Sequence, residues 1–451
     1  MEQTRIIPPG GGDPNNRTQA MNDFGRTQAM TDLGRTAMVG AVRALEVDVI
    51  SGNRYALSNE PSRDHVLLQL RSSANMMGRR LPINLALVID RSGSMEGEPL
   101  DYVKRACGYV VDLLDQNDVL SIVTFEEQVD VIMPARRVVN KTLLKEHINR
   151  IEPGNTTNLY DGLVVGCNQV SSVAAPGYVN RVLLLTDGDP TAGIKDFGSI
   201  VGQVAEQKSR GITVTALGFG PEYNEELMAG IARQSGGNYY YISRPDLIPE
   251  VFRRELESLM TITARNMRLR LNLSKWVQLR QIYGRQPSFS GRFAEVGLVD
   301  MERGSAMSVL CELEFAPRPA GIYRVAKAEL FYDDATSGRA ETITTDIEFE
   351  FTPDRSLVQA NVNPVIRQEI EVALASRNLE KTVMGMKTQQ LSAMTATMEL
   401  QRTMSLLASQ GRTAEAEEVR KAIDSIQQGG PGAEKTLIGT IYSLDQGKRK
   451  D

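Results

Sequence analysis

The chain has 451 residues and a formal net charge of −5, which gives no reason to expect binding to nucleic acid or to an anionic membrane. No apolar run approaches the roughly 20 residues that a membrane-spanning helix needs. Because only two histidines and three widely spaced cysteines occur, a histidine-rich metal site, a disulfide framework and a cysteine metal site are excluded.

The first 40 residues are rich in Gly, Pro, Asn and Thr and have few large apolar side chains. Such a segment cannot bury enough apolar surface to offset the entropy of ordering, so residues 1–40 are predicted to be disordered. The start of the chain lacks the basic and apolar regions of a signal peptide, and unpaired cysteines fit a reducing compartment. We therefore expect a cytoplasmic protein.

Two β-rich segments are expected to form one β-sandwich domain. Residues 41–79 contain the alternating runs LEVDVISGNRYAL and HVLLQLRSS, and residues 262–355 contain further strand-like runs such as SAMSVLCELEF and ETITTDIEFEF. The early strands have no partners near them in sequence. We therefore expect them to complete the later sandwich, with the intervening residues inserted between its two pieces.

Residues 80–261 alternate strand and helix patterns. The strands, at about 81–90, 118–125, 181–187, 211–220 and 238–243, include nearly continuous apolar runs such as LPINLALVID, and helical patterns lie between them. Strands buried on both faces and alternating with helices predict a doubly wound α/β domain with a mainly parallel sheet. Residues 356–428 show apolar residues at helical spacing and are predicted to be helical, and residues 429–451 are predicted to be a flexible tail.

Three stretches of the α/β domain place hydroxyls and carboxylates near the carboxyl ends of its strands, where such domains bind ligands. Asp90-Arg91-Ser92-Gly93-Ser94 directly follows the first buried strand, Gly154-Asn155-Thr156-Thr157-Asn158 precedes a helix, and Thr186-Asp187-Gly188-Asp189 follows VLLL. Oxygen donors of this kind suit Mg²⁺, which prefers octahedral oxygen coordination and keeps several waters.

These stretches resemble the metal-ion-dependent adhesion site of the von Willebrand factor A domain family. DRSGS (90–94) matches its D-x-S-x-S motif, NTTNLYDGL (155–163) resembles the loop with its threonine, and LLLTDGD (183–189) resembles its strand-and-aspartate segment. The flanking strands and helical region also resemble bacterial cytoplasmic members. The resemblance implies a non-catalytic protein that holds Mg²⁺ or Mn²⁺ and binds the Asp or Glu carboxylate of a protein partner. The implied metal ligands are Asp90, Ser92, Ser94, Thr157 and Asp187.

Some alternatives stay open. Thr156 could replace Thr157 as the ligand, and Asp90 with its serines could simply cap the following helix. DGDPT (187–191) also fits the D-x-D-x-T motif of Mg²⁺-dependent phosphatases, in which Asp187 would be the nucleophile. A structural scaffold without metal is the third reading.

The N-terminal segment repeats Arg-Thr at intervals of nine residues, with Thr18, Thr27 and Thr36 each followed three places later by an apolar residue. One reading is duplication in a linker under little constraint. The other is phosphorylation by a Ser/Thr kinase, which needs an accessible chain. A phosphothreonine with an apolar residue three places on resembles the ligands of forkhead-associated domains, so a protein with such a domain is a second expected partner.

Overall fold

The computed structural model of the chain describes residues 44–449, apart from 74–79, 174–176, 336 and 431. The predicted disordered segment 1–40, with Thr18, Thr27 and Thr36, lies outside the described residues. Within the described part of the chain, no helix is both long and apolar enough to cross a membrane.

The α/β region is built on a six-stranded sheet in which every pairing is parallel except that of the edge strand β6 with β5. All eight residues of β4 are buried, as its continuous apolar run predicts. In sheet order the strands are β6 (Val129–Arg137), β5 (Val119–Phe125), β4 (Ile83–Asp90), β7 (Val179–Thr186), β8 (Ile212–Phe219) and β9 (Tyr239–Ile242).

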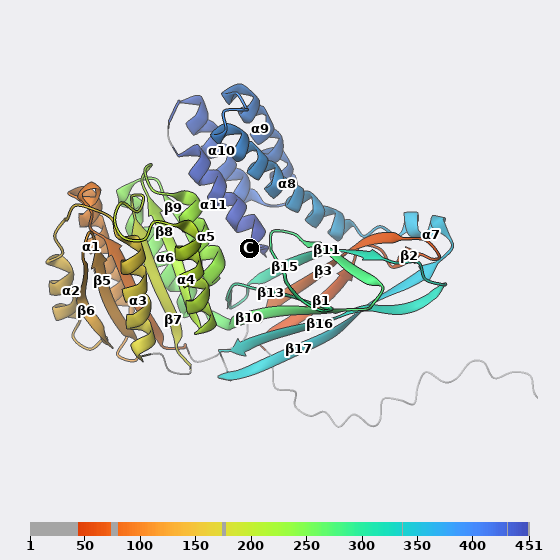
Figure 1. The fold of residues 1–451 in the computed structure, drawn as a ribbon, viewed down its shortest axis with the longest axis horizontal. Coiled ribbons are helices and arrows are strands. Elements are labelled where there is room, and N and C mark those ends of the chain that lie inside the picture. The colour runs from red at the N-terminus through yellow and green to blue at the C-terminus, as the bar shows by residue number, and fades with distance from the viewer. Residues whose placement is uncertain (1–43, 74–79, 174–176, 336, 431, 450–451) are drawn as a thin grey trace, which may run out of the picture. The chain divides into compact units, whose positions relative to one another are not determined.

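Helices cover both faces of this sheet (Figure 1). One apolar cluster joins the sheet to α1 (Glu98–Leu113), α2 (Lys141–Asn149) and α6 (Ile248–Met260). The other joins it to α3 (Leu159–Val173), α4 (Phe197–Ser209) and α5 (Glu225–Ser235). The predicted doubly wound fold is confirmed. Two short 3₁₀ turns, η1 (Gly93–Met95) and η2 (Pro245–Leu247), complete this region.

Two further sheets pack face to face around a separate apolar core. The first contains β1 (Leu45–Ser51), β3 (Ser62–Ser72), β15 (Ala306–Phe315) and β11 (Val277–Ile282), with β18 (Lys448–Arg449) also paired to β15. The second contains β12 (Ser288–Ser290), β13 (Phe293–Gly297), β10 (Ile262–Leu273), β16 (Gly321–Asp334), β17 (Arg339–Thr352) and β2 (Tyr55–Leu57), with β14 (Met301–Glu302) paired to β10.

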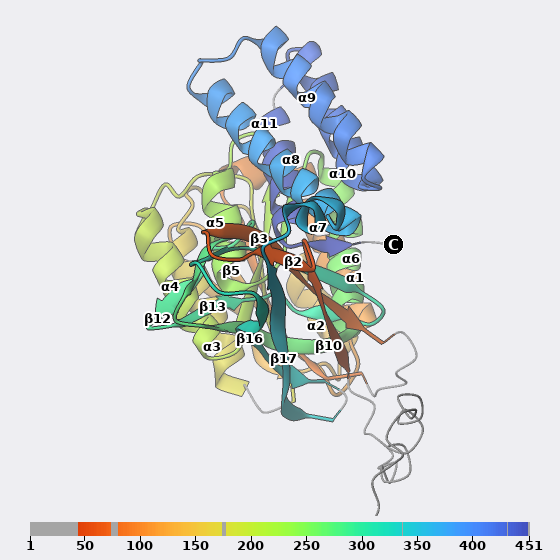
Figure 2. The same cartoon turned by 90° about the vertical axis from the view of Figure 1, so that its right-hand side faces the viewer.

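The strands that precede the α/β region therefore pair with strands that follow it. β3 runs antiparallel to β15 over ten residue pairs, and β2 runs parallel to the end of β17. Figure 2 shows these early strands, coloured red to orange, among the later blue-green ones. As expected, the α/β region is inserted into a β-sandwich.

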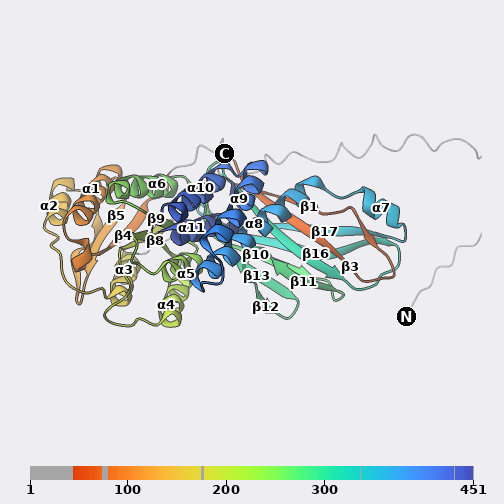
Figure 3. The ribbon, with the colours of Figure 1, turned by 90° about the horizontal axis from the view of Figure 1, so that it is seen from above.

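The chain continues through α7 (Arg355–Ala360), α8 (Pro364–Lys387), α9 (Ala393–Ser409), α10 (Thr413–Gln427) and α11 (Ala433–Asp445). The helical prediction for 356–428 agrees with α7 to α10. The break between α9 and α10 falls at Gly411, whose φ of 75° is in the left-handed region that favours glycine. α11 and α8 to α10 share one apolar core, and Figure 3 shows them from above.

The flexible tail predicted for 429–451 is wrong for the residues that the structure describes, because α11 and β18 lie there. The apolar side chains of Leu437, Ile441 and Tyr442 are at most 5% exposed, and the Tyr442 hydroxyl donates a hydrogen bond to the Gly237 carbonyl. The Lys435 ammonium lies 2.7 Å from the Glu225 carboxylate. Burial against α5 and β9 thus orders a segment that was predicted to be flexible.

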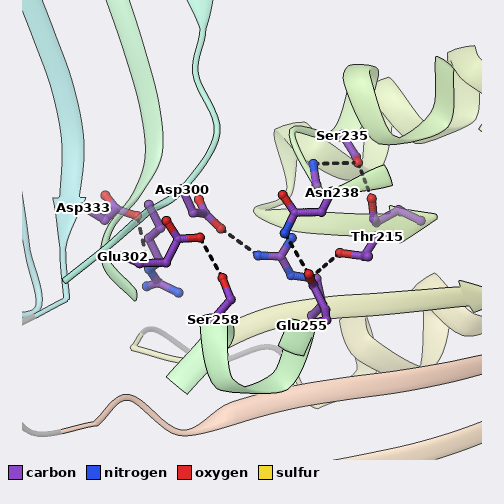
Figure 4. Close-up of polar contacts among 12 residues, drawn as sticks. Thr215, Ser235, Asn238, Glu255, Ser258, Asp300, Glu302 and Asp333 are labelled. Carbon is purple, nitrogen blue, oxygen red and sulfur yellow. Dashed lines mark hydrogen bonds and ion pairs between the residues drawn. The ribbon is translucent and has the colours of Figure 1, made fainter. Parts of the chain in front are cut away.

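Figure 4 shows polar contacts where the α/β region meets the sandwich. Arg181 at the start of β7 is 2% exposed and forms an ion pair of 2.9 Å with Asp300. The Ser258 hydroxyl on α6 donates to Glu302. The carboxylate of Glu255 is fully buried and accepts hydrogen bonds from Thr215, Asn238 and Tyr240.

Candidate metal site

The predicted site residues come from three segments at the carboxyl edge of the α/β sheet. Asp90 is the last residue of β4, and Ser92 and Ser94 lie in the turn that leads to α1. Asp187 directly follows β7, the neighbour of β4, and Thr157 precedes α3. The fold therefore brings together residues that are about a hundred positions apart in the sequence.

Three side-chain oxygens lie within hydrogen-bond reach of one another. The Ser94 hydroxyl donates to Asp187 Oδ1 at 2.9 Å, the Ser92 hydroxyl lies 3.5 Å from the same oxygen, and the two hydroxyls are 3.2 Å apart. Ser92 is 2% exposed and Asp187 6% exposed, whereas Ser94 is exposed. The cluster therefore opens to solvent on the side of Ser94.

Asp90 lies beneath this cluster and is 0% exposed. Its Oδ1 accepts a hydrogen bond from the Ser92 backbone N–H at 2.8 Å, and its Oδ2 accepts one from the Thr186 hydroxyl at 2.5 Å. Burial raises the pKa of Asp90 to about 6, the Asp187 charge acts in the same direction, and the hydrogen bonds from Thr186 and Ser92 oppose the shift. Burial also raises the pKa of Asp187.

Thr157 is held against the loop after β7 by its main chain. Its N–H donates to the Thr191 hydroxyl at 2.8 Å, and its carbonyl accepts from the N–H groups of Thr191 and Ala192. Its hydroxyl lies 3.7 Å from the point where a Cβ on Gly188, the residue after Asp187, would stand. The Thr156 hydroxyl is buried and has no hydrogen-bond partner among the described residues, so Thr156 stays open as the alternative ligand.

The donor set fits a small divalent cation. Neighbouring ligands in an octahedral Mg²⁺ site lie about 2.9 Å apart, since each is about 2.0–2.1 Å from the metal. The spacings of 2.9–3.5 Å among Ser92, Ser94 and Asp187 are close to this value. No group of three or more His, Cys, Asp and Glu side chains within the described segments could hold a metal ion, and this site contains only two acids beside its hydroxyls.

The phosphatase reading involves some of the same atoms. Asp187 Oδ1, which would have to attack a phosphorus atom, accepts hydrogen bonds from both serines of the D-x-S-x-S motif. Asp189 is exposed, and the Thr191 hydroxyl accepts the Thr157 N–H. Ser92 and Ser94 thus contact Asp187, although the D-x-D-x-T motif of the phosphatases assigns no role to these serines.

One contributor to the site was not foreseen from the sequence. Thr186 holds the buried carboxylate of Asp90 from the neighbouring strand, and its oxygen also accepts the Gly188 N–H at 3.3 Å. The position of Thr186 directly before Asp187 could have indicated that its side chain lies near the site. The contact itself depends on the register in which β7 pairs with β4, and the sequence does not state that register.

Comparison with known families places this site within a recognised domain. Residues 84–254 match the sequence profile of the von Willebrand factor type A domain. The chain therefore contains a von Willebrand factor type A domain, and domains of this family are generally protein-interaction or metal-binding modules.

Relatives of known sequence extend the similarity beyond this domain. The chain is 27% identical over 293 residues to the uncharacterized protein sll0103 of Synechocystis, an alignment that covers 63% of this chain and 69% of that protein. It is 29% identical over 287 residues to the uncharacterized protein YfbK of Escherichia coli, covering 61% of this chain but only 50% of that protein. Human inter-alpha-trypsin inhibitor heavy chain H4 is 25% identical over 234 residues, or 46% of this chain and 25% of that protein.

Solved structures show that the wider fold occurs elsewhere. A von Willebrand factor type A protein from Catenulispora acidiphila superimposes with a TM-score of 0.71 at 18% identity, covering 84% of this chain and 90% of that one. The ArnB paralog VWA2 from Sulfolobus acidocaldarius gives a TM-score of 0.61 at 18% identity, covering 89% of this chain and 98% of that one. Because the alignments include most of each chain, the fold similarity is not confined to the α/β region.

Proposed function

We propose that this chain is a non-catalytic, cytoplasmic interaction module that holds Mg²⁺ or Mn²⁺ and binds a protein partner through that cation. The proposed ligands are Asp90, Ser92, Ser94, Thr157 and Asp187. The observation that carries the proposal is the cluster of Ser92, Ser94 and Asp187 oxygens above the buried Asp90 carboxylate.

The proposed ligands have different roles in the site. Asp90 orients the turn by accepting the Ser92 N–H, and the serine hydroxyls and Asp187 supply the oxygens nearest to solvent. A divalent cation bound there would keep part of its positive charge, because two of the five proposed ligands are acids and the others are neutral hydroxyls. That charge would attract a carboxylate from a partner. The partner is therefore expected to contribute an Asp or Glu side chain.

A pull-down from the native host tests this function. The full chain is used as bait in Mg²⁺, in excess chelator and as the Asp187→Asn variant. Partners that bind the wild type in Mg²⁺ and are lost under both other conditions support the proposal. Partners that bind equally well in chelator and to the Asp187→Asn variant contradict the proposal. Release of phosphate from an aryl phosphate by the wild type but not by the Asp187→Asn variant also contradicts it.

We also propose that a Ser/Thr kinase phosphorylates Thr18, Thr27 and Thr36 and that forkhead-associated domains bind the products. Support comes from the nine-residue spacing, which gives each threonine its own arginine and its own apolar residue. Several identical sites would also strengthen binding through multivalency. Intact-mass measurement of protein purified from its host tests this idea. A tail without phosphate in every growth condition would overturn it.

A further inference from the structure

Arg91 lies inside the D-x-S-x-S motif, at a position that the motif leaves open. Its side chain is 17% exposed, and the guanidinium forms ion pairs with Asp130 at 2.9 Å and with Glu126 at 3.4 Å. Glu126 lies in the turn from β5 to β6 and Asp130 is the second residue of β6, so the side chain of Arg91 connects the turn after β4 to the β5–β6 hairpin.

Arg91 and Glu126 also contact the loop that carries the proposed threonine ligand, through the Arg91 side chain and through the main chain of both residues. Arg91 Nη1 contacts the Glu152 carbonyl at 3.5 Å, and the Arg91 carbonyl accepts the Gly154 N–H at 2.5 Å. On the other side, the carbonyl of Glu126 accepts the Asn158 N–H at 2.7 Å. Residues 152–158 are thus held by Arg91 at one end and by Glu126 at the other.

The carboxylate of Glu126 is itself fixed within this arrangement. Hydrogen bonds from the backbone of Glu127, Gln128 and Asn155, together with the Arg91 charge, hold the pKa of Glu126 below its usual value. A Cβ on Gly154 would lie 2.7 Å from Glu126 Cγ and 3.1 Å from Arg91 Nη1. Glycine at this position therefore leaves the space in which the ion pair and the loop meet.

We propose that Arg91, Glu126 and Asp130 form a clamp that positions Thr157 against the serine and aspartate ligands. This proposal rests on the proposed function of the metal site. The side chain of Arg91 points to the loops, and none of its described contacts is to Asp90, Ser92 or Asp187. Arg91 is thus a positioning residue. It increases the fraction of molecules in which all the proposed ligands are oriented toward the metal position at the same time.

Titration calorimetry of the full chain with Mn²⁺ tests the clamp in four proteins. These are the wild type, Arg91→Ala, Arg91→Lys and the control Arg210→Ala, which removes an exposed ion pair with Glu206 on α4. Loss of groups that orient metal ligands typically weakens affinity by about 10- to 100-fold. We expect a loss of that size in Arg91→Ala, partial recovery in Arg91→Lys and no change in the control.

Unfolding temperatures in chelator separate positioning from general stability. The Arg91→Ala protein should unfold within a few degrees of the Arg210→Ala control, since metal affinity and not the fold depends on the clamp. If Arg91→Ala does not fold, Asp130→Asn takes its place, because Asp130 is 52% exposed. The double variant Arg91→Asp with Asp130→Arg should recover affinity that either single change loses.

The outcomes distinguish the clamp from the site it serves. Equal Mn²⁺ affinity in the wild type and in Arg91→Ala would overturn the clamp and leave the metal site standing. A loss of affinity matched by a large loss of stability in chelator would also overturn it in favour of a structural role. No Mn²⁺ binding by the wild type would overturn the proposed function, and the clamp with it.

Discussion

The acids of the candidate site differ in what surrounds them. Asp90 is fully buried and has both carboxylate oxygens in hydrogen bonds, whereas Asp187 lies at the solvent side of the same cluster beside the exposed Ser94. Changing Asp90 would leave the Thr186 hydroxyl and the Ser92 N–H without their buried acceptor, which itself costs about 1–3 kcal/mol. Substitutions of Asp187 therefore report on the site more cleanly than those of Asp90.

Thr157 and Thr156 can be told apart by matched substitutions. Thr157→Val should lower Mn²⁺ affinity by about tenfold or more, corresponding to about 1.4 kcal/mol, because it removes a proposed ligand and keeps the side-chain volume. Thr156→Val should leave the affinity unchanged. Calorimetric titration of both variants measures this difference, and the reverse ranking would show that Thr156 is the ligand.

Asp64 predicts a pH dependence of stability that has nothing to do with the site. Its carboxylate accepts the His65 N–H at 2.6 Å, and burial raises its pKa to about 7. Between about pH 4 and 7 the folded chain then binds more protons than the unfolded chain, so this contribution to stability is present at low pH and is lost as pH rises through 7.

The Asp64→Asn variant isolates that contribution. It should be less sensitive to the change from pH 5 to pH 8 than the wild type by about 1–3 kcal/mol, since one pKa unit corresponds to about 1.4 kcal/mol. Urea unfolding at the two pH values gives the comparison. An identical change in both proteins would mean that Asp64 ionises at its ordinary pKa.

At the scale of elements, the buried parallel strands were predictable and the peripheral segments were not. β4 is apolar at nearly every position, so its burial on both faces is readable from the sequence. β6 is an edge strand that is largely half-buried or exposed and contains Pro134, so its pattern is weak. α11 carries Gly439 and follows a glycine-rich turn, and its order comes from burial against distant elements.

The same distinction applies to the candidate site. DRSGS, the threonine loop and LLLTDGD could be located by their order and by their place after apolar strands. The contacts of Arg91 with Glu126 and Asp130 could not be predicted, because they depend on how the chain turns from β5 into the antiparallel strand β6. The residues of a motif can be read directly from a short stretch of sequence. The contacts that hold those residues in place depend on which loops the folded sheet brings together.

α11 should contribute measurably to stability. Leu437 is 0% exposed in the core shared by α8 to α11, so Leu437→Ala should destabilise the chain by about 2–5 kcal/mol. Met394→Ala on α9 is the matched control, because Met394 is 76% exposed and should cost little. Thermal unfolding measures both. Equal melting temperatures for the two variants would contradict the packing of α11.

At the scale of the whole described chain, the von Willebrand factor type A domain is joined to the sandwich by polar as well as covalent links. Both connections of the inserted region lead into sandwich strands, β3 before it and β10 after it. Side-chain contacts add to these connections (Figure 4): Arg181 pairs with Asp300, and Ser258 donates a hydrogen bond to Glu302. Buried ion pairs are costly to break, so the junction is expected to resist separation of the two regions.

Asp300→Ala tests the junction. It would leave the guanidinium of Arg181, whose side chain is 3% exposed, without its ion-pair partner, and breaking such a pair typically costs about 3–5 kcal/mol. Glu257→Ala removes an exposed pair with Arg253 and should cost less than about 1 kcal/mol. Denaturant unfolding compares the two variants, and a similar small effect of both would refute a stabilising junction.

The central claim is that the carboxyl edge of the α/β sheet holds a divalent cation. Calorimetric titration of the full chain with Mg²⁺ and with Mn²⁺, beside the Asp187→Asn variant, tests it most directly. The predicted result is one binding event in the wild type and an affinity at least about tenfold lower in the variant. Absence of metal-dependent heat in the wild type, or the same affinity in both proteins, would contradict the claim.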